Sequence, residues 1–430
     1  MFFERPDRGE TAILVHIDLD SEQEQEDPVE FEELVLSAGA VPAIFIKGSR
    51  KQPDAGLFIG SGKLEEIKAA VEEHEAEVVL FNHALTPSQE RNLEARLSCR
   101  VLDRTGLILD IFAQRARSYE GKLQVELAQL EHTVTRLKRG WTHLDRQKGG
   151  IGLRGAGETQ LELDQRMIRQ RIKSINASLI KVRGQRDQGR RSRKRADIPT
   201  VSLVGYTNAG KSSLFNVMAN EHIYAADQLF ATLDSTLRRI QVPNFGAAIL
   251  ADTVGFISHL PHKLVAAFRA TLEESAEASL LLHVIDVANE QHKFFTEQVE
   301  EVLAEIGADE VPCLQVCNKI DLLDDRAPHV ERNQAGEPVR VWISARTGEG
   351  IDLLLSAIGE LLGHDVVEYS LRLAPEQGRL RARLYAKGAV VHENIDADGL
   401  VCLDVRLPRK DLDRLLVDEG MTPSGTSAGL

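Results

Sequence analysis

The sequence contains no apolar run as long as a membrane-spanning helix, and its start lacks the basic stretch and apolar core of a signal peptide. Cysteine is scarce, and its spacing is not that of metal ligands: the cysteines are Cys99, Cys313, Cys317 and Cys402. Scattered cysteines of this kind are typical of reduced thiols inside the cell. We therefore expect a globular cytoplasmic chain with no stable insertion into a membrane.

Positive charge is scarce over most of the chain, whose net charge is −14. Taken alone, this value argues against a nucleic-acid partner. The distribution is uneven, however. Residues 111–195 contain 21 Lys and Arg against 8 Asp and Glu, a balance of +13, so the rest of the chain carries −27. This asymmetry predicts an anionic partner for that segment.

Residues 201–213 contain the most informative motif. An apolar run ending at Gly205 predicts a buried strand, and Lys211 opens a predicted helix. Between them the spacing is G-x-x-x-x-G-K-S, in which glycines let backbone N–H groups surround a phosphate. Lys211 can reach the outer phosphates, and Ser212 can hold Mg²⁺. The residues expected to bind nucleotide here are Gly205, Asn208, Ala209, Gly210, Lys211, Ser212 and Ser213.

Further motifs follow at the ends of predicted strands. Asp252 and Gly255 form D-x-x-G, whose carboxylate can reach the magnesium shell through water. Thr232 lies in a polar segment before that strand and can close over Mg²⁺ and the γ-phosphate. We therefore assign a catalytic role to Lys211, Thr232, Asp252 and Gly255, and a metal-binding role to Ser212, Thr232 and Asp252.

Two later motifs favour guanine as the base. Asp321, in the run Asn318-Lys319-Ile-Asp321, can accept the two N–H groups that guanine presents and adenine lacks. Ser344-Ala345-Arg346 follows another predicted strand and can approach the base with backbone N–H groups. Because the motifs occur in a consistent order at strand ends, we assign GTP and GDP rather than ATP.

Hydrolysis is expected to be slow without a partner. Many GTPases place Gln directly after D-x-x-G to orient the attacking water, whereas this chain has Phe256. A docking partner could order residues 225–262 and supply the missing group. Asn208 has two interpretations: it resembles a residue that holds K⁺ against the phosphates in potassium-activated GTPases, or it bonds its own backbone.

The segments on either side predict additional domains. Residues 1–108 alternate strand and helix patterns, which is typical of a parallel α/β domain. Gly60-Ser-Gly62-Lys63 has the wrong spacing for a phosphate loop, so a strand-to-helix turn is favoured over a second nucleotide site. Residues 198–363 form the expected GTPase domain, and residues 364–430 a small α+β domain with a disordered tail.

Residues 109–197 predict a long helical hairpin. Apolar residues recur with heptad spacing from Leu123 to Leu144 and from Ile168 to Val182. Between these arms, Gly149 to Thr159 holds five glycines in its first nine residues and predicts a mobile tip loop. The basic balance favours RNA contact over a solvated face. The residues assigned to it are Arg154, Arg190, Arg191, Arg193, Lys194 and Arg195.

Over nearly its whole length the chain resembles the HflX family of GTPases. The specific marks are Gly149–Glu158, Ala225–Asp234 and Asp252–Ile257. The resemblance implies an α/β multidomain fold, GTP hydrolysis, and GTP-dependent binding to the large (50S) ribosomal subunit. It also implies separation of stalled ribosomes under stress, with the hairpin approaching ribosomal RNA near the peptidyl transferase centre. Arg346 departs from the family's commoner lysine, and backbone contacts should survive that change.

Two other functions compete with this one. The first is a regulatory switch whose hairpin recruits a protein partner. For this function, as for the ribosomal one, we expect the chain to be monomeric. The second is an RNA-remodelling factor with an ATP site in residues 1–108, for which the sequence offers no helicase motif. The basic balance of residues 111–195 favours RNA over a protein partner.

Overall fold

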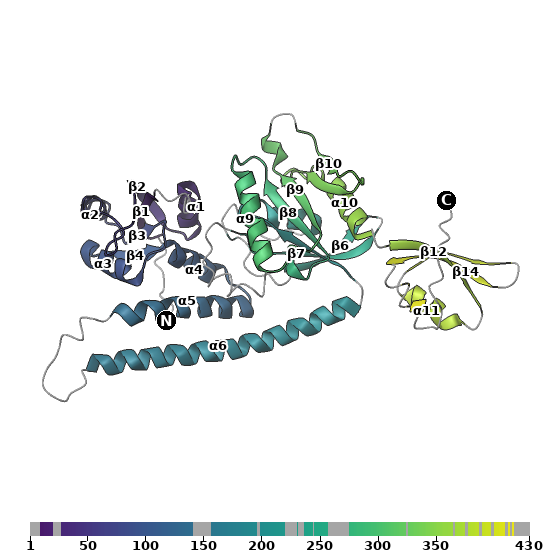
Figure 1. Ribbon diagram of the computed structural model, residues 1–430, viewed down its shortest axis with the longest axis horizontal. Helices are drawn as coiled ribbons and strands as arrows, with labels where there is room; N and C mark the ends of the chain where they lie inside the picture. Colours follow the sequence, from purple (N-terminus) through teal and green to yellow (C-terminus); the bar gives the residue numbers. More distant parts are fainter. Residues whose placement is uncertain are drawn as a thin grey trace.

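A computed structural model of the chain shows an elongated molecule (Figure 1). An N-terminal domain, a central domain and a small C-terminal domain follow one another, and two long helices run beneath the first two. The structure describes residues 9–19, 27–140, 156–195, 198–219, 230, 236–243, 245–256, 275–323, 326–363, 366–374, 377–386, 389–396, 400–408, 412, 415 and 416.

The N-terminal domain is a parallel sheet with helices on its faces. Its described strands have the order β2-β1-β3-β4 and are β1 (Thr11–Leu19), β2 (Val41–Arg50), β3 (Val78–Phe81) and β4 (Arg100–Asp103). The helices are α1 (Pro28–Ser37), α2 (Ser61–Glu73), α3 (Pro87–Leu97) and α4 (Arg104–Arg115). A buried apolar cluster lies on each side of the sheet, as expected when helices cover both faces. The glycine motif at 60–63 lies at the start of α2.

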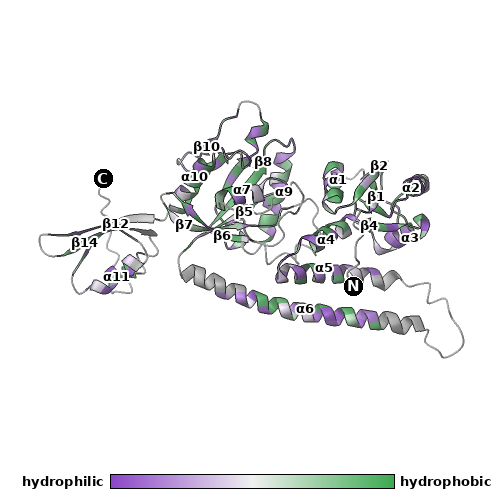
Figure 2. Ribbon diagram, turned by 180° about the vertical axis from the view of Figure 1, so that it is seen from behind, coloured by the Kyte–Doolittle hydropathy of each residue, from purple (hydrophilic) through white to green (hydrophobic). Residues whose placement is uncertain are grey.

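Helices α5 (Tyr119–Gly140) and α6 (Ala156–Arg195) form an antiparallel pair. Leu123 and Ile175, from the two heptad patterns, are buried, as is typical of a helical seam. Seen from behind, hydrophilic residues occupy most of the described length of α6 (Figure 2). The tip loop was expected to extend to Thr159. The end of this prediction was wrong, because α6 already begins at Ala156. Residues 141–155 lie outside the described part of the chain.

The central domain has a mixed sheet with the order β10-β11-β9-β8-β5-β7-β6 among its described strands. They are β5 (Thr200–Val204), β6 (Thr236–Val242), β7 (Gly246–Asp252), β8 (Leu280–Asp286), β9 (Cys313–Asn318), β10 (His329–Arg332) and β11 (Pro338–Trp342). Its helices include α7 (Lys211–Ala219), α9 (His292–Glu305), the short η2 (Ile320–Leu322) and α10 (Ile351–Gly363). The parallel strands β5, β7, β8, β9 and β11 bring their carboxyl ends to one edge, where ligands of α/β sheets bind.

The C-terminal domain is an antiparallel sheet with the described order β12-β14-β13, packed against a helix. Its elements are β12 (Val366–Leu373), α11 (Gly378–Ala386), β13 (Val390–Ile395) and β14 (Val401–Pro408). The fold class predicted from the sequence, α/β and multidomain with a small C-terminal α+β part, is therefore confirmed. The tail expected at the end of this domain lies outside the described residues.

Candidate nucleotide site

The loop between β5 and α7 depends on glycine at two positions. Gly205 has φ +147°, and a Cβ there would lie 2.3 Å from the Val284 carbonyl oxygen. Gly210 has φ +93°, and a Cβ there would lie 2.2 Å from Nδ2 of Asn318. Only glycine fits such close approaches to neighbouring strands. The loop is therefore wedged between the ends of β5, β8 and β9, with Lys211 at the start of α7.

Lys211 is held beneath this loop. Its ammonium donates to the carbonyl oxygens of Gly205 at 2.9 Å and Tyr206 at 2.6 Å, and the residue is only 6% exposed. Burial lowers the pKa of Lys211 to about 8, against the opposing effect of the Asp252 carboxylate. A buried cation fixed at the N-terminus of a helix is suited to binding phosphate oxygens.

Ser212 and Asp252 lie together at the end of β7. The Ser212 hydroxyl donates to Oδ2 of Asp252 at 3.0 Å, and Asp252 is 3% exposed. A hydroxyl and a carboxylate side by side are the oxygen ligands that Mg²⁺ prefers, so these residues fit the ion that a P-loop nucleotide carries. Thr232, the third expected ligand, lies outside the described residues.

The segment after Asp252 lies against the loop. Thr207 N–H donates to the Phe256 carbonyl at 2.7 Å, and Phe256 N–H donates to the Gly205 carbonyl at 3.2 Å. A Cβ on Gly255 would lie 3.0 Å from Nζ of Lys211, so the D-x-x-G glycine lies directly over the lysine. The Phe256 side chain packs into a buried apolar cluster, where it offers no polar atom to a water. The hydroxyl oxygen of Thr207 is buried without a hydrogen-bond partner in the described structure.

The residues assigned to the base meet at the ends of β9 and β11. Asn318 donates through Nδ2 to the Ala209 carbonyl at 2.8 Å and accepts the Ala345 N–H at 2.9 Å. Asp321 accepts the Ser344 hydroxyl at 2.7 Å, which fixes its carboxylate beside the chain at 344–346. Asn318 therefore joins the phosphate loop to the loop that follows β11, and the sequence motifs become one continuous site.

Lys319 adopts a left-handed conformation, with φ +70°, and its ammonium lies 2.7 Å from Asp286 at the end of β8. Arg346, the expected departure from the family pattern, is exposed in the same loop as Ala345. A pocket of about 110 Å³ lies beside the phosphate loop, between α1 and α9, and Asn208 and Asp286 contribute to its lining.

Sequence reasoning missed the contact between the phosphate loop and the N-terminal domain. Tyr206 donates its hydroxyl to Glu30 of α1 at 2.8 Å, and its ring stacks on Phe295 of α9 at 4.1 Å between centroids. Glu30 and Tyr206 are 176 positions apart. No local sequence pattern predicts such a contact. The only indication in the sequence was Glu30 itself, a glutamate placed among the apolar residues of α1.

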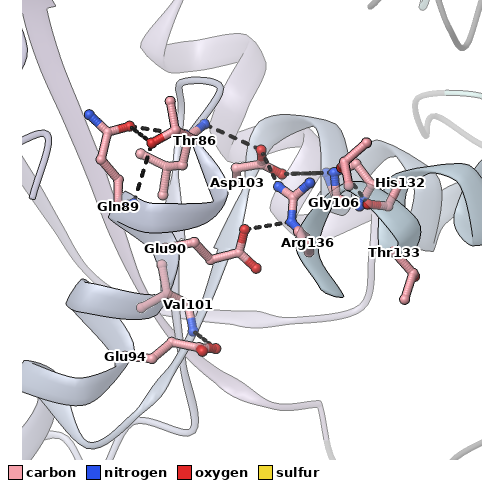
Figure 3. Close-up of polar contacts among 12 residues, drawn as sticks. Thr86, Gln89, Glu90, Glu94, Val101, Asp103, Gly106, His132, Thr133 and Arg136 are labelled. Carbon is pink, nitrogen blue, oxygen red and sulfur yellow. Dashed lines mark hydrogen bonds and ion pairs between the residues drawn. The ribbon is translucent and has the colours of Figure 1, made fainter. Parts of the chain in front are cut away.

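The residues assigned to RNA contact are only partly placed. Arg154 lies outside the described residues, and Arg190 to Arg195 lie in the last turns of α6, where the side chains are not described. Arg136 of α5, which is also a cation of the basic segment 111–195, contacts the N-terminal domain (Figure 3). Its guanidinium donates to Glu90 at 2.6 Å and to Asp103 at 2.9 Å, so its charge is already paired.

The fold and the site define a P-loop GTPase: a glycine loop with a buried lysine, a Ser–Asp pair whose oxygens suit Mg²⁺, and an Asn–Asp motif at the end of β9. Family models match successive parts of the chain. They are described as GTP-binding GTPase N-terminal (residues 25–113), GTP-binding GTPase middle region (115–193), 50S ribosome-binding GTPase (200–319) and HflX C-terminal domain (329–425).

Curated relatives extend over almost the entire chain. GTPase HflX of Escherichia coli K12 is 58% identical over 97% of this chain and 98% of its own length. GTPase HflX of Caldanaerobacter subterraneus is 45% identical over 91% of this chain and 90% of its own. The chain belongs to the HflX family of GTPases, binds guanine nucleotide and hydrolyses GTP.

Among solved structures, a GTP-binding protein of Sulfolobus solfataricus in complex with GDP is similar to this chain. It is 26% identical, covers 83% of this chain and 99% of its own, and has a TM-score of 0.45. Among the described residues, no helix is long and apolar enough to cross a membrane.

Proposed function

We propose that this GTPase binds the large ribosomal subunit in its GTP-bound form and separates stalled ribosomes under stress in the cytoplasm. The observation that carries the proposal is α6, a 40-residue helix with an exposed basic surface. Basic residues along its described middle are exposed to solvent: Arg166, Arg169, Lys173, Lys181 and Arg183. A rigid rod of positive charge is suited to phosphate backbones. The family description of residues 200–319 supports a ribosomal target.

Within the site we assign roles from the geometry. Lys211 would hold the β- and γ-phosphates, and Ser212, Asp252 and Thr232 would hold Mg²⁺, the last two as the switch-side ligands. Asp321 would accept the guanine N–H groups, with Asn318 fixing the loops on either side. Mg²⁺ would neutralise the charge that develops on the phosphates during hydrolysis.

Docking on the ribosome would also supply the group that orients the attacking water, a role that Phe256 cannot fill. Since its side chain is buried in an apolar cluster, the group that orients the attacking water must come from elsewhere. Asn208 is exposed and lines the pocket beside the loop, a position from which it could hold K⁺ against the phosphates. Turnover measured in equal K⁺ and Na⁺, with and without 50S subunits, separates these contributions. Ribosome stimulation without a potassium preference would remove the cation role alone.

Sedimentation tests the central claim. The full chain is centrifuged with 50S subunits in the presence of GDP or a non-hydrolysable GTP analogue. We expect the chain to pellet with the subunits in the analogue and to stay in the supernatant in GDP. A second assay follows the conversion of 70S ribosomes to subunits by light scattering. Pelleting that does not depend on the nucleotide would contradict the proposal.

A protein partner for the hairpin is the competing function. Met167 and Ile180 favour it, because they are 52% and 68% exposed on α6 and offer apolar contacts that RNA would not use. The salt dependence of binding distinguishes the two partners. RNA contact releases counterions and makes affinity fall steeply with salt, whereas an apolar protein interface does not.

A further inference from the structure

The phosphate loop is held from outside the GTPase domain. Tyr206 is the second residue of that loop, and its hydroxyl donates to Oε1 of Glu30 in the N-terminal domain at 2.8 Å. Its ring is stacked on Phe295, with 25° between the planes. The side chain is therefore fixed at its tip by one domain and along its face by the other.

The acceptor is itself anchored in the N-terminal domain. Glu30 lies 3.2 Å from Arg104, and the two residues are only 7% and 3% exposed. Arg104 also donates to Asn82 at 2.8 Å, at the end of β3. Burial raises the pKa of Glu30, while Arg104 and the Tyr206 hydroxyl act in the opposite direction. A carboxylate that is paired with a buried guanidinium and accepts a second domain's hydroxyl cannot shift without weakening both contacts.

Apolar contacts lock the same interface. Phe230, which precedes the expected switch threonine, packs edge-on against Phe112 of α4 with 4.6 Å between ring centroids. Val254, from D-x-x-G, belongs to the same buried cluster as α1 and α4. Glu30 therefore meets Tyr206 within a packed interface and not at a mobile surface.

The main chain of Tyr206 gives this contact a consequence. Its carbonyl oxygen accepts the ammonium of Lys211 at 2.6 Å, so the position of Tyr206 sets the position of the phosphate-binding cation. We propose that Glu30 and Tyr206 are positioning residues for the GTPase reaction, through which the N-terminal domain holds Lys211 ready for the phosphates. Neither residue touches the reacting atoms. They reduce the ordering that nucleotide binding would otherwise require.

The proposal makes a kinetic distinction. Lys211 binds the outer phosphates in the ground state and the transition state alike, so loosening it weakens binding more than it slows chemistry. Tyr206→Phe removes one hydrogen bond to a charged acceptor and keeps the ring stack. We expect KM for GTP and Kd for GDP to rise about tenfold, with kcat changed less than twofold.

Glu30→Leu removes the acceptor of the Tyr206 hydroxyl, and it is expected to have an effect of the same kind. In a double-mutant cycle, Tyr206→Phe combined with Glu30→Leu should be no worse than the stronger single variant, because each substitution removes the same bond. Tyr385→Phe is the matched control. Its hydroxyl also donates to a glutamate, Glu393, but within the C-terminal domain, and KM should stay at the wild-type value.

Thermal unfolding of each variant is recorded in parallel. A lowered melting temperature with unchanged KM and Kd would show that the pair only stabilises the domain interface, and would overturn the proposal. Fully additive effects of the two substitutions would also overturn it. A fall in KM would overturn it too, because the contact would then restrain the loop instead of preparing it.

Discussion

Replacing Gly210 with alanine should break the joint between the phosphate loop and the base site. The new Cβ would lie 2.2 Å from Nδ2 of Asn318, a distance that real Cβ contacts do not reach. Asn318 is 2% exposed, and its amide holds both the Ala209 carbonyl and the Ala345 N–H. Relieving the clash therefore requires the amide to swing away and give up both bonds.

The size of the effect follows from these losses. Two hydrogen bonds contribute about 1 kcal/mol each, and a non-glycine residue at φ +93° costs about 1 kcal/mol more. If the loop must return to its present geometry to bind phosphate, the sum of about 3 kcal/mol is lost from the free energy of GTP binding. We expect the Kd for GTP, measured by equilibrium titration with a fluorescent analogue, to rise about 100-fold.

Gly336→Ala separates the clash from the backbone strain. Gly336 has φ +84°, in the turn between β10 and β11, but nothing lies within 4 Å of its Cβ position. It should cost about 1 kcal/mol of stability and leave GTP affinity unchanged. Asn318→Ala provides the second comparison. In this background the Cβ added by Gly210→Ala has no Asn318 amide to clash with, so the second substitution should cause little further loss of affinity. Wild-type affinity in Gly210→Ala alone, within threefold, would refute the steric reasoning.

Further substitutions test the other assignments. Asp321→Asn should favour xanthine over guanine nucleotides in competition binding, and retained GTP preference would contradict the role of Asp321. Arg136→Ala should lower the free energy of unfolding by about 3 kcal/mol, because it leaves Asp103 and Glu90 without their cation, while GTP affinity stays constant. Arg154→Ala should leave GTP affinity intact and impair ribosome-stimulated hydrolysis; equal loss of GTP binding in the isolated chain would disprove it. The basic end of α6 consists of Arg190, Arg191, Arg193, Lys194 and Arg195. Replacing these residues with alanine should weaken 50S binding and flatten its salt dependence by about 0.7–0.9 log units per lost phosphate contact for each decade of salt. An unchanged slope would show that this helix end is only solvated.

The arrangement of the candidate nucleotide site could be predicted because its parts are local. Each motif follows a buried strand, and parallel strands bring their carboxyl ends to one edge whatever the rest of the chain does. Lys211, Ser212 and Asp252 therefore meet where the spacing places them. The same holds for the N-terminal sheet, in which apolar runs and helix patterns alternate. The alternation expected over residues 1–108 is seen in β3, α3, β4 and α4, which follow one another along the chain.

Edge strands were missed for a physical reason. β10 has four residues and β13 has the burial pattern of a half-exposed strand, so neither shows the apolar alternation that a buried face imposes. β6 follows the polar segment around Thr232, and it pairs antiparallel with β7. The start of α6 was misplaced because glycines at 155 and 157 suggest a loop, while the long amphipathic helix that follows begins at Ala156 despite Gly157.

Charge counting was least informative where side chains turn inward. The balance of +13 in residues 111–195 treats every cation as available to a partner. Arg136 bridges two carboxylates of the N-terminal domain, and Arg171 donates two bonds to Glu126 across the helix pair. These arginines hold α5 against its neighbours, so their charges are already paired within the fold and are less available to a partner. The positive surface available to a partner is therefore smaller than the count suggests, and several of its described exposed cations lie along α6, among them Arg166, Arg169 and Lys173.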